Sequence, residues 1–143
     1  MLNDTELARL AEHYEPGDAA APARWRLLFD PDASGPVALV NRFTLREQAA
    51  YPDGRAATGF EAFMAYAASS VPAVDRAGGR FLVSSPVLTS MFGAPDGTQI
   101  VAVGWFPDRG ALLAMLRDPE YQAAFAHRRA AVVAESVVVA NGR

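Results

Sequence analysis

The chain has 143 residues, of which 51% are hydrophobic and 20% charged, and its net charge is −3. This composition is typical of one soluble globular domain, and the lack of a basic face argues against nucleic acid as a partner. The chain has no cysteine, which excludes disulfides, a thiol nucleophile and cysteine-bound metal sites. No apolar run approaches the ~20 residues of a membrane helix and no signal-like core is present, so we expect a cytoplasmic protein without membrane partners.

Two short helices are predicted at the N-terminus. Asn3 begins a capping-box pattern for the first, and the second is predicted over residues 18–29, where Trp25 lies on the apolar face. Residues 30–36 are dense in helix-breaking residues and end this pattern. We interpret residues 1–35 as a helical arm that packs either on its own domain or on a partner subunit.

The next segments alternate between strand and helix. A first strand is expected over residues 37–43, a long polar loop over 45–59 and the main helix over 60–77, with a kink or early end at Pro72. A second strand region, interrupted by a proline, is predicted over residues 80–91. The apolar stripe expected to be buried on the main helix consists of Phe60, Phe63, Met64, Ala67, Val71 and Val74.

The C-terminal part carries the clearest start signals. Residues 100–106 are apolar on both faces, which indicates a strand covered on both sides. Asp108 caps a short helix, and Asp118, followed by proline and glutamate, starts a longer one. Arg128 interrupts the apolar stripe of that longer helix, and a last strand is expected over residues 135–140.

This order of elements predicts an α+β fold. Residues 36–143 give a ferredoxin-like βαββαβ domain, with a four-stranded antiparallel sheet and helices on one face. The opposite face would carry valine, leucine and tryptophan with no cover from its own chain, and such a face does not stay in water. Pairing two sheets across a twofold axis buries both faces, so we expect a homodimer.

Three runs of sequence carry a resemblance to a known family: GGRFLV (78–83), VAVGWFPDRGALLAML (101–116) and RDPEYQAAFAHRR (117–129). Together they resemble domain-of-unknown-function family 1330, of the dimeric α/β-barrel superfamily, and the similarity spans residues 36–140. The resemblance implies a dimer with a small pocket between sheet and helices in each subunit. Relatives in the superfamily include cofactor-free monooxygenases, muconolactone-type isomerases and haem-dependent enzymes, whereas the family itself has no established reaction.

Several chemistries find no support in the residues. The two histidines, His13 and His127, lie far apart with no ligand spacing around them, so neither a metal nor haem is expected. No nucleophile elbow or phosphate-binding loop is present, and the absence of lysine excludes Schiff-base chemistry. We therefore expect no cofactor.

Polar residues on apolar surfaces form the candidate site. Asn41 interrupts a strand face and Arg128 a helix stripe, while Tyr66 and His127 flank two helix stripes. We assign Asn41, Arg128 and Trp105 to substrate binding, and His127 and Tyr66 to proton transfer. Each polar residue also has a structural interpretation. For Arg128 the alternative is pairing with Glu135 or Glu61.

Three classes of function remain open. A binding protein would hold a small organic, possibly anionic, metabolite in a pocket between sheet and helices. A cofactor-free enzyme of the monooxygenase or isomerase type would add a base of suitable pKa. A purely structural dimer would fill the pocket with its own side chains.

Overall fold

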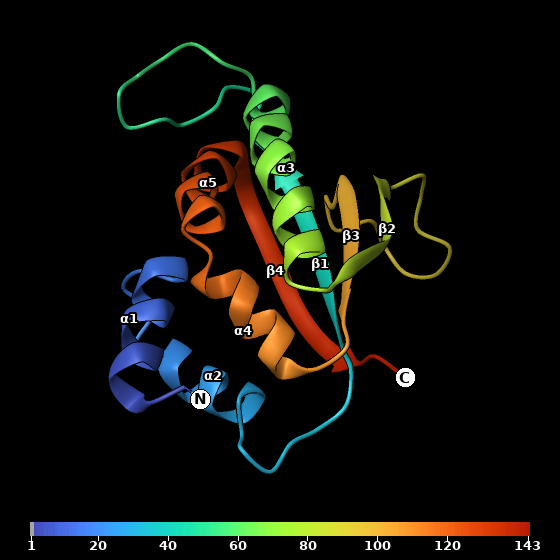
Figure 1. Ribbon diagram of the computed structural model, residues 1–143. Helices are drawn as coiled ribbons and strands as arrows, with labels where there is room; N and C mark the ends of the chain where they lie inside the picture. Colours follow the sequence, from blue (N-terminus) through green and yellow to red (C-terminus); the bar gives the residue numbers. More distant parts are fainter. Residues whose placement is uncertain (1) are drawn as a thin grey trace.

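The computed structural model describes residues 2–143, and Figure 1 shows their arrangement. Five helices and four strands follow one another in this part of the chain. Their bounds are α1 (Asp4–Tyr14), α2 (Ala21–Leu28), β1 (Val37–Leu45), α3 (Gly59–Arg76), β2 (Arg80–Pro86), β3 (Ile100–Phe106), α4 (Arg109–Arg117), α5 (Pro119–Ala131) and β4 (Val132–Asn141).

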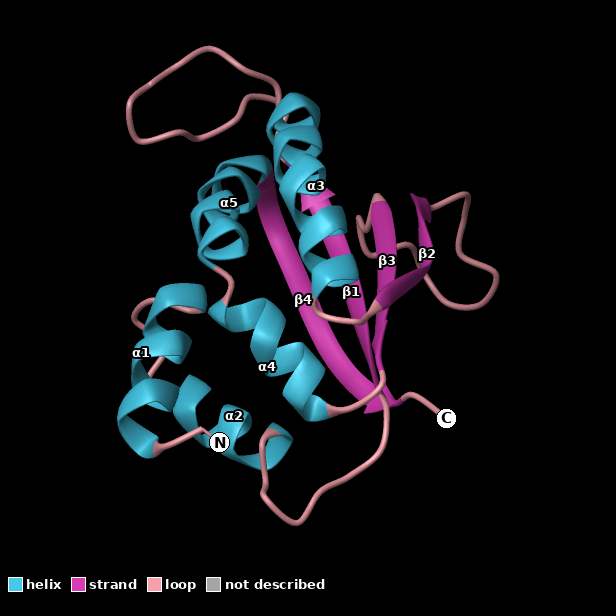
Figure 2. Cartoon of the chain, viewed as in Figure 1, coloured by secondary structure: helices cyan, strands magenta, loops and turns pink. Residues whose placement is uncertain are grey.

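The four strands form one antiparallel sheet in the order β2-β3-β1-β4. Helices α3, α4 and α5 cover one face of this sheet (Figure 2). The α+β class and the four-stranded antiparallel sheet with helices on one face are therefore confirmed. In the register, Asn41 lies between Ala102 and Val137, so these three side chains share the helix face.

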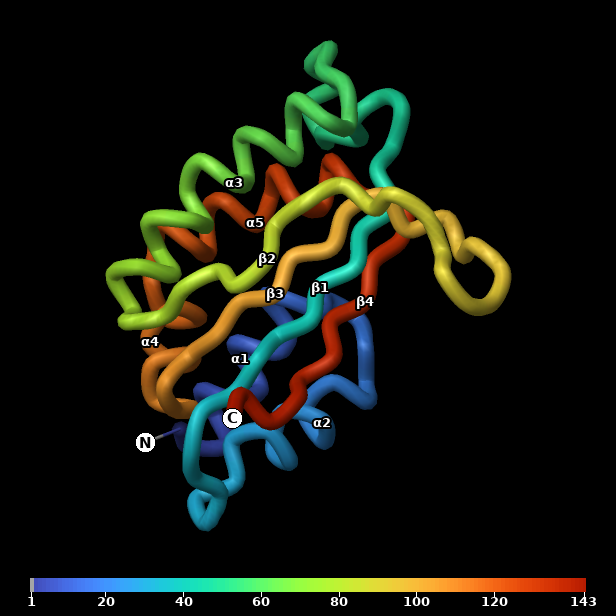
Figure 3. The backbone as a smooth tube through the Cα atoms, turned by 90° about the vertical axis from the view of Figure 1, so that its right-hand side faces the viewer, coloured from blue at the N-terminus to red at the C-terminus, as the bar shows by residue number. Residues whose placement is uncertain are grey.

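The other face of the sheet is open. Figure 3 looks onto it, and no helix lies in front of the strands. Register places Val40, Val103, Trp105 and Val138 on this face, and 58% of Val138 is exposed. The uncovered apolar face thus exists as the alternation of residues predicted, whereas the dimer that would cover it stays a prediction.

The helix start signals act through side chains. Asn3 accepts a hydrogen bond from the Glu6 amide, and Asp118 accepts one from the Glu120 amide. Thr58 and Glu61 form a reciprocal capping box at the start of α3, which the sequence analysis did not identify.

Helix α3 differs from the predicted helix in two ways. It runs through Pro72 without ending, because both Pro72 and Ala68, whose carbonyl loses its partner, are exposed to water. Its buried face is also rotated, so that Tyr66 and Ser70 point inward. Three residues of the predicted stripe are exposed instead: Phe60, Met64 and Val71.

The N-terminal arm packs on its own chain. Leu10 and Tyr14 of α1 belong to the same buried cluster as the sheet residues, and the Tyr14 hydroxyl donates to the Leu116 carbonyl at 2.7 Å. Trp25 of α2 stacks on Tyr14, with ring centroids 5.8 Å apart. Of the two expected docking places, the arm therefore occupies the one on its own domain.

Strand bounds differ from prediction at β2 and β4. Strand β2 ends at Pro86, and the following segment carries exposed Leu88 and Phe92 instead of more strand. Strand β4 begins at Val132, directly after α5, so Glu135 lies inside it. No helix within residues 2–143 has the length and apolar character needed to cross a bilayer.

Candidate functional site

Arg128 is the centre of a polar cluster between the sheet and the helices. It lies on α5, is 4% exposed, and reaches Glu135 of β4 through Nη2 at 2.9 Å and Nε at 3.1 Å. Its Nη1 donates to the Tyr66 hydroxyl at 3.1 Å, and its Nη2 donates to Asn41 Oδ1 at 3.4 Å. One side chain thus connects β1, α3, α5 and β4.

One N–H group of Arg128 is left over. A guanidinium has five N–H donors, and the four hydrogen bonds use one on Nε, one on Nη1 and two on Nη2. The second N–H of Nη1 has no acceptor among residues 2–143. A buried donor without an acceptor costs free energy, so this position favours an acceptor from outside the chain.

The tyrosines add a second spare donor. The Tyr66 and Tyr121 hydroxyls are 2.8 Å apart, so one of their two protons lies between them. Tyr66 already accepts from Arg128, and neither hydroxyl has a further acceptor among residues 2–143. One phenolic proton is therefore free to bond a ligand oxygen.

Burial fixes the charge states of these groups. Burial raises the pKa of Tyr121 well above its usual value, and the neighbouring Tyr66 adds to this rise. Burial disfavours the charged form of Arg128, but Tyr66, Tyr121 and Glu135 outweigh it and raise the Arg128 pKa. At neutral pH the cluster therefore contains a cation, Arg128, and a neutral phenol, Tyr121, both of them hydrogen-bond donors.

Aromatic rings hold the guanidinium in place. Its central carbon lies 4.7 Å from the ring centroid of Phe43 and 4.9 Å from that of Phe125. Such contacts stabilise a buried cation through the negative faces of the rings. The orientation of Arg128 is thus set before any ligand arrives.

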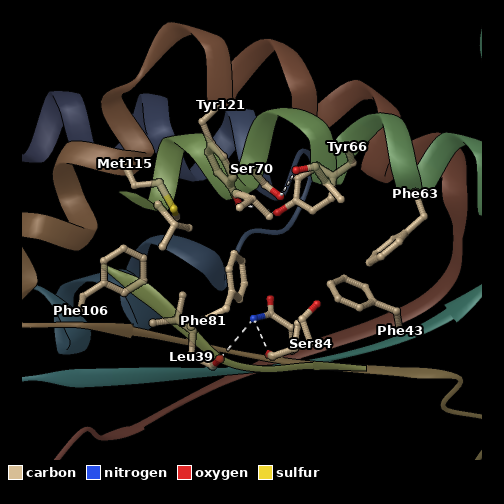
Figure 4. A pocket seen from close by; sticks show the side chains of 16 residues that line it. Leu39, Phe43, Phe63, Tyr66, Ser70, Phe81, Ser84, Phe106, Met115 and Tyr121 are labelled. Atoms are coloured by element: carbon tan, nitrogen blue, oxygen red, sulfur yellow. Dashed lines mark hydrogen bonds between the residues drawn. The ribbon is translucent and has the colours of Figure 1, made fainter. Parts of the chain in front are cut away.

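A small cavity lies on one side of the cluster, between α3 and the sheet. Figure 4 shows Tyr66, Ser70 and Tyr121 above it, and Phe81 and Ser84 on the side of the sheet. Its volume is about 50 Å³, room for a few water molecules and no metabolite.

A larger groove lies on the other side of the cluster. Its volume is about 660 Å³, within the range of small-molecule sites. Strands β1 and β4 form its floor, and α4, α5 and the arm form its walls. Tyr121, Asn41 and Arg128 line its inner end, so the polar cluster opens onto this groove.

The predicted site residues separate into two groups. Asn41, Tyr66 and Arg128 are joined by hydrogen bonds, as a convergent site requires. His127 instead faces the 45–59 loop, where its Nδ1 lies 2.6 Å from the Tyr51 hydroxyl. Trp105 lies on the open face of the sheet, with its indole N–H on the Gly142 carbonyl.

Two contributors were missed or only partly predicted. Tyr121 was assigned only to an apolar stripe, although a tyrosine beside a buried arginine is a signal for a polar partner. Glu135 was named as a structural partner of Arg128, and its carboxylate also lines the groove. Arm residues such as Trp25 and Leu28 form a wall that the sequence analysis did not connect with the site.

The cluster offers no metal site. Within residues 2–143, no three histidine, aspartate or glutamate side chains come together in a way that could hold an ion. His13 is engaged elsewhere, with its Nε2 3.0 Å from the Gln122 carbonyl. The chemistry available at the site is hydrogen-bond donation to an oxygen atom.

The similarity to known structures covers more of the chain than the sheet domain. A solved structure described as the methylated RPA0582 protein is 32% identical, with a TM-score of 0.78, and the match covers 92% of this chain and 95% of that one. A second, described as a protein of unknown function from Rhodopseudomonas palustris, is 31% identical, covers 90% and 95%, and has a TM-score of 0.77. The first match leaves out 8% of the 143 residues, about 11, so most of the arm has a counterpart.

No curated protein matches the chain. The model of the family described as "Domain of unknown function (DUF1330)" matches residues 56–142, which is more than half of the sequence. This protein belongs to the DUF1330 family.

Proposed function

We propose that the protein is a homodimer that binds a small organic molecule in the groove between the sheet, α4, α5 and the arm. The observation that carries the proposal is the pair of spare donors, on Arg128 and on the Tyr66–Tyr121 pair, at the inner end of a 660 Å³ groove. A ligand oxygen at this place would accept hydrogen bonds that the chain itself leaves unmade.

The unfilled groove favours binding over a purely structural role. Val137 and Val139 lie on the helix face of β4, yet they are 40% and 41% exposed, because no side chain of residues 2–143 covers them. A structural dimer would bury such residues at the density of a protein interior. An apolar ligand in the groove would remove them from water.

The position of the histidines favours binding over catalysis. Neither His13 nor His127 lines the groove, and its two carboxylates, Glu15 and Glu135, are each held by an arginine. A proton-transfer enzyme needs a base within reach of the substrate. The groove therefore has hydrogen-bond donors to orient a ligand but no unpaired base among its lining residues.

The open face of the sheet supports the dimer. A flat apolar face without cover is the usual surface of a stable subunit contact, and two copies related by a twofold axis present the same face to each other. In such a dimer the groove would stay accessible, because it opens on the helix side of the sheet.

A pair of tryptophan substitutions on β4 tests the groove. A screen of small carboxylic acids, ketones and phenols by ligand-observed NMR identifies binders to the unmodified protein. Val139→Trp fills the groove floor and should abolish their binding, whereas Val133→Trp is the control, because Val133 is 57% exposed on the same strand outside the groove. Binding that survives Val139→Trp would place the ligand elsewhere and reject the proposal.

A further inference from the structure

The two ends of the groove differ in charge. At the inner end, the Arg128 cation is matched by the Glu135 carboxylate, so this end offers donors without net charge. At the other end lies Arg109, the first residue of α4, which also lines the groove. What this second arginine contacts decides which part of a ligand each end would hold.

Arg109 is held in place but not neutralised. Its Nε donates to the Leu28 carbonyl at 2.7 Å, and its Nη1 donates to the Ser34 carbonyl at 3.2 Å. Both acceptors are backbone groups of the arm, which carry no charge. Within residues 2–143, no carboxylate oxygen lies within 4.0 Å of this guanidinium, and three of its five N–H groups remain available.

A third arginine that lines the groove, Arg24, differs from Arg109 in its partners. Arg24 of α2 also lines the groove, but its Nη2 lies 2.9 Å from Glu15 and 2.7 Å from Asp18. Its charge is therefore compensated by carboxylates, like that of Arg128. Of the three arginines that line the groove, Arg109 is the one whose charge is not matched by a carboxylate of the described chain.

The groove between the ends is long and apolar. The polar cluster contacts Asn41, and the outer end lies at Pro36 and Val37, four residues earlier on the same strand. At a strand rise of about 3.3 Å per residue, the ends are roughly 13 Å apart along the floor. The floor between them includes Leu39 and Val139, and the wall includes Leu112.

We propose that the ligand is an elongated acid whose carboxylate binds Arg109 and whose far end carries a neutral hydroxyl or carbonyl oxygen that accepts from Tyr121 and Arg128. This inference rests on the proposed binding function and adds the class and direction of the ligand. The charged group binds where the cation is unmatched, and the neutral acceptor binds where donors remain but the charge is already balanced. The apolar body lies along β1 and β4.

Three probes of equal length test the direction of binding: ω-hydroxydecanoic acid, decanoic acid and decane-diol. Calorimetry measures the affinity of each for the full-length protein. Replacing the carboxylate by a hydroxyl should weaken binding roughly tenfold or more, because a charge-assisted hydrogen bond is lost. Removing the ω-hydroxyl should weaken it by about fivefold, the usual effect of one neutral hydrogen bond.

Variants assign each effect to one end of the groove. Arg109→Gln should remove most of the preference for the acid over the diol. Arg109→Lys keeps the charge but lacks the guanidinium hydrogen bonds to the arm, and should retain the preference. Arg26→Gln, which removes an exposed arginine of α2 that does not line the groove, is the control and should leave the preference unchanged. Tyr121→Phe should remove the advantage of the ω-hydroxyl, whereas Tyr51→Phe should keep it, because Tyr51 does not line the groove and its hydroxyl contacts His127 instead.

The outcomes separate this inference from the function it rests on. If Arg109→Gln keeps the full preference for the acid, or if none of the three probes binds, the assigned ligand class is wrong, while the screen with Val139→Trp still decides whether the groove binds a ligand at all. If the probes bind and Val139→Trp does not block them, they bind outside the groove, and both proposals fail.

Discussion

The two faces of the sheet show that exposed valines can have different meanings. On β4, Val137 and Val139 point to the helix side, where walls and a buried polar cluster surround an open volume. Val138 lies between them in sequence but points to the opposite side, which is apolar and uncovered (Figure 3). A walled groove with convergent donors suits a small molecule, whereas an open apolar face suits another protein surface.

The arginines of the two faces repeat this contrast. The Arg128 side chain is 5% exposed in its pair with Glu135, and the Arg42 side chain, which forms an ion pair with Asp96, is 47% exposed. Water solvates Arg42 whether or not its partner is present. Arg128 has almost no contact with water. The ion pair on its side of the sheet should therefore contribute more to the free energy of unfolding than the exposed pair on the open face.

The largest expected effect comes from placing a charge on the open face. Val138→Arg would bury an unpaired arginine beside its copy in the proposed dimer, at a cost of several kcal/mol, and should shift the dimer to monomer. Light scattering at micromolar concentration should give about twice the 15.3 kDa chain mass for the unmodified protein and the single mass for the variant. An unmodified protein that is already a monomer would reject the dimer.

Stability then distinguishes the two arginines. Arg128→Met removes the partner of Glu135 and of the Tyr66 hydroxyl, and should cost about 3 kcal/mol in the free energy of unfolding. Arg42→Met removes an exposed ion pair and should cost less than about 1 kcal/mol. Urea titration of both variants measures the difference, and equal losses would mean that the buried cluster contributes no more than a surface pair.

Much of the fold could be predicted because its signals are local. Asp118 caps α5, and the alternation of residues 100–106 separates the two sheet faces without knowledge of any distant contact. The convergence of Asn41, Tyr66 and Arg128 was predictable for a related reason, since each polar residue interrupts or flanks an apolar surface. A buried polar group must find a partner, and these three were the available ones.

Two of the predicted site residues, His127 and Trp105, lie apart from the Arg128 cluster because of their angle around a helix and their side of a strand. His127 is next to Arg128 in sequence, but one residue is about 100° of rotation on a helix, which turns His127 toward Tyr51. Trp105 shares its strand face with Val103, as alternation indicated, and that face is the open one. Being near the site in sequence was not enough for either residue.

The groove itself could not be predicted, because it depends on contacts between distant segments. Its arm wall exists since Tyr14 bonds Leu116 and Leu28 bonds Arg109, across 102 and 81 residues of sequence. Local patterns gave the two helices of the arm but not the surface on which they pack. A site between segments so far apart becomes visible only in three dimensions.

The smallest expected effect appears at high pH and belongs to the helix side of the sheet. The pKa of Tyr121 is raised above 10.0 mainly by burial, so above pH 10 the folded chain keeps a proton that the unfolded chain loses. Deprotonation of the unfolded state then favours unfolding, and stability falls as pH rises, by up to about 1.4 kcal/mol per pH unit for one group.

Tyr121→Phe should make this decline less steep. The measurement is a set of urea titrations between about pH 9 and 11, a range centred on the usual tyrosine pKa of ~10. The control Trp105→Phe changes an aromatic residue of the open face that does not titrate, and should leave the slope as steep as before. An equally steep slope in Tyr121→Phe would mean that this hydroxyl is not held neutral by burial, and would remove it as the donor at the inner end of the groove.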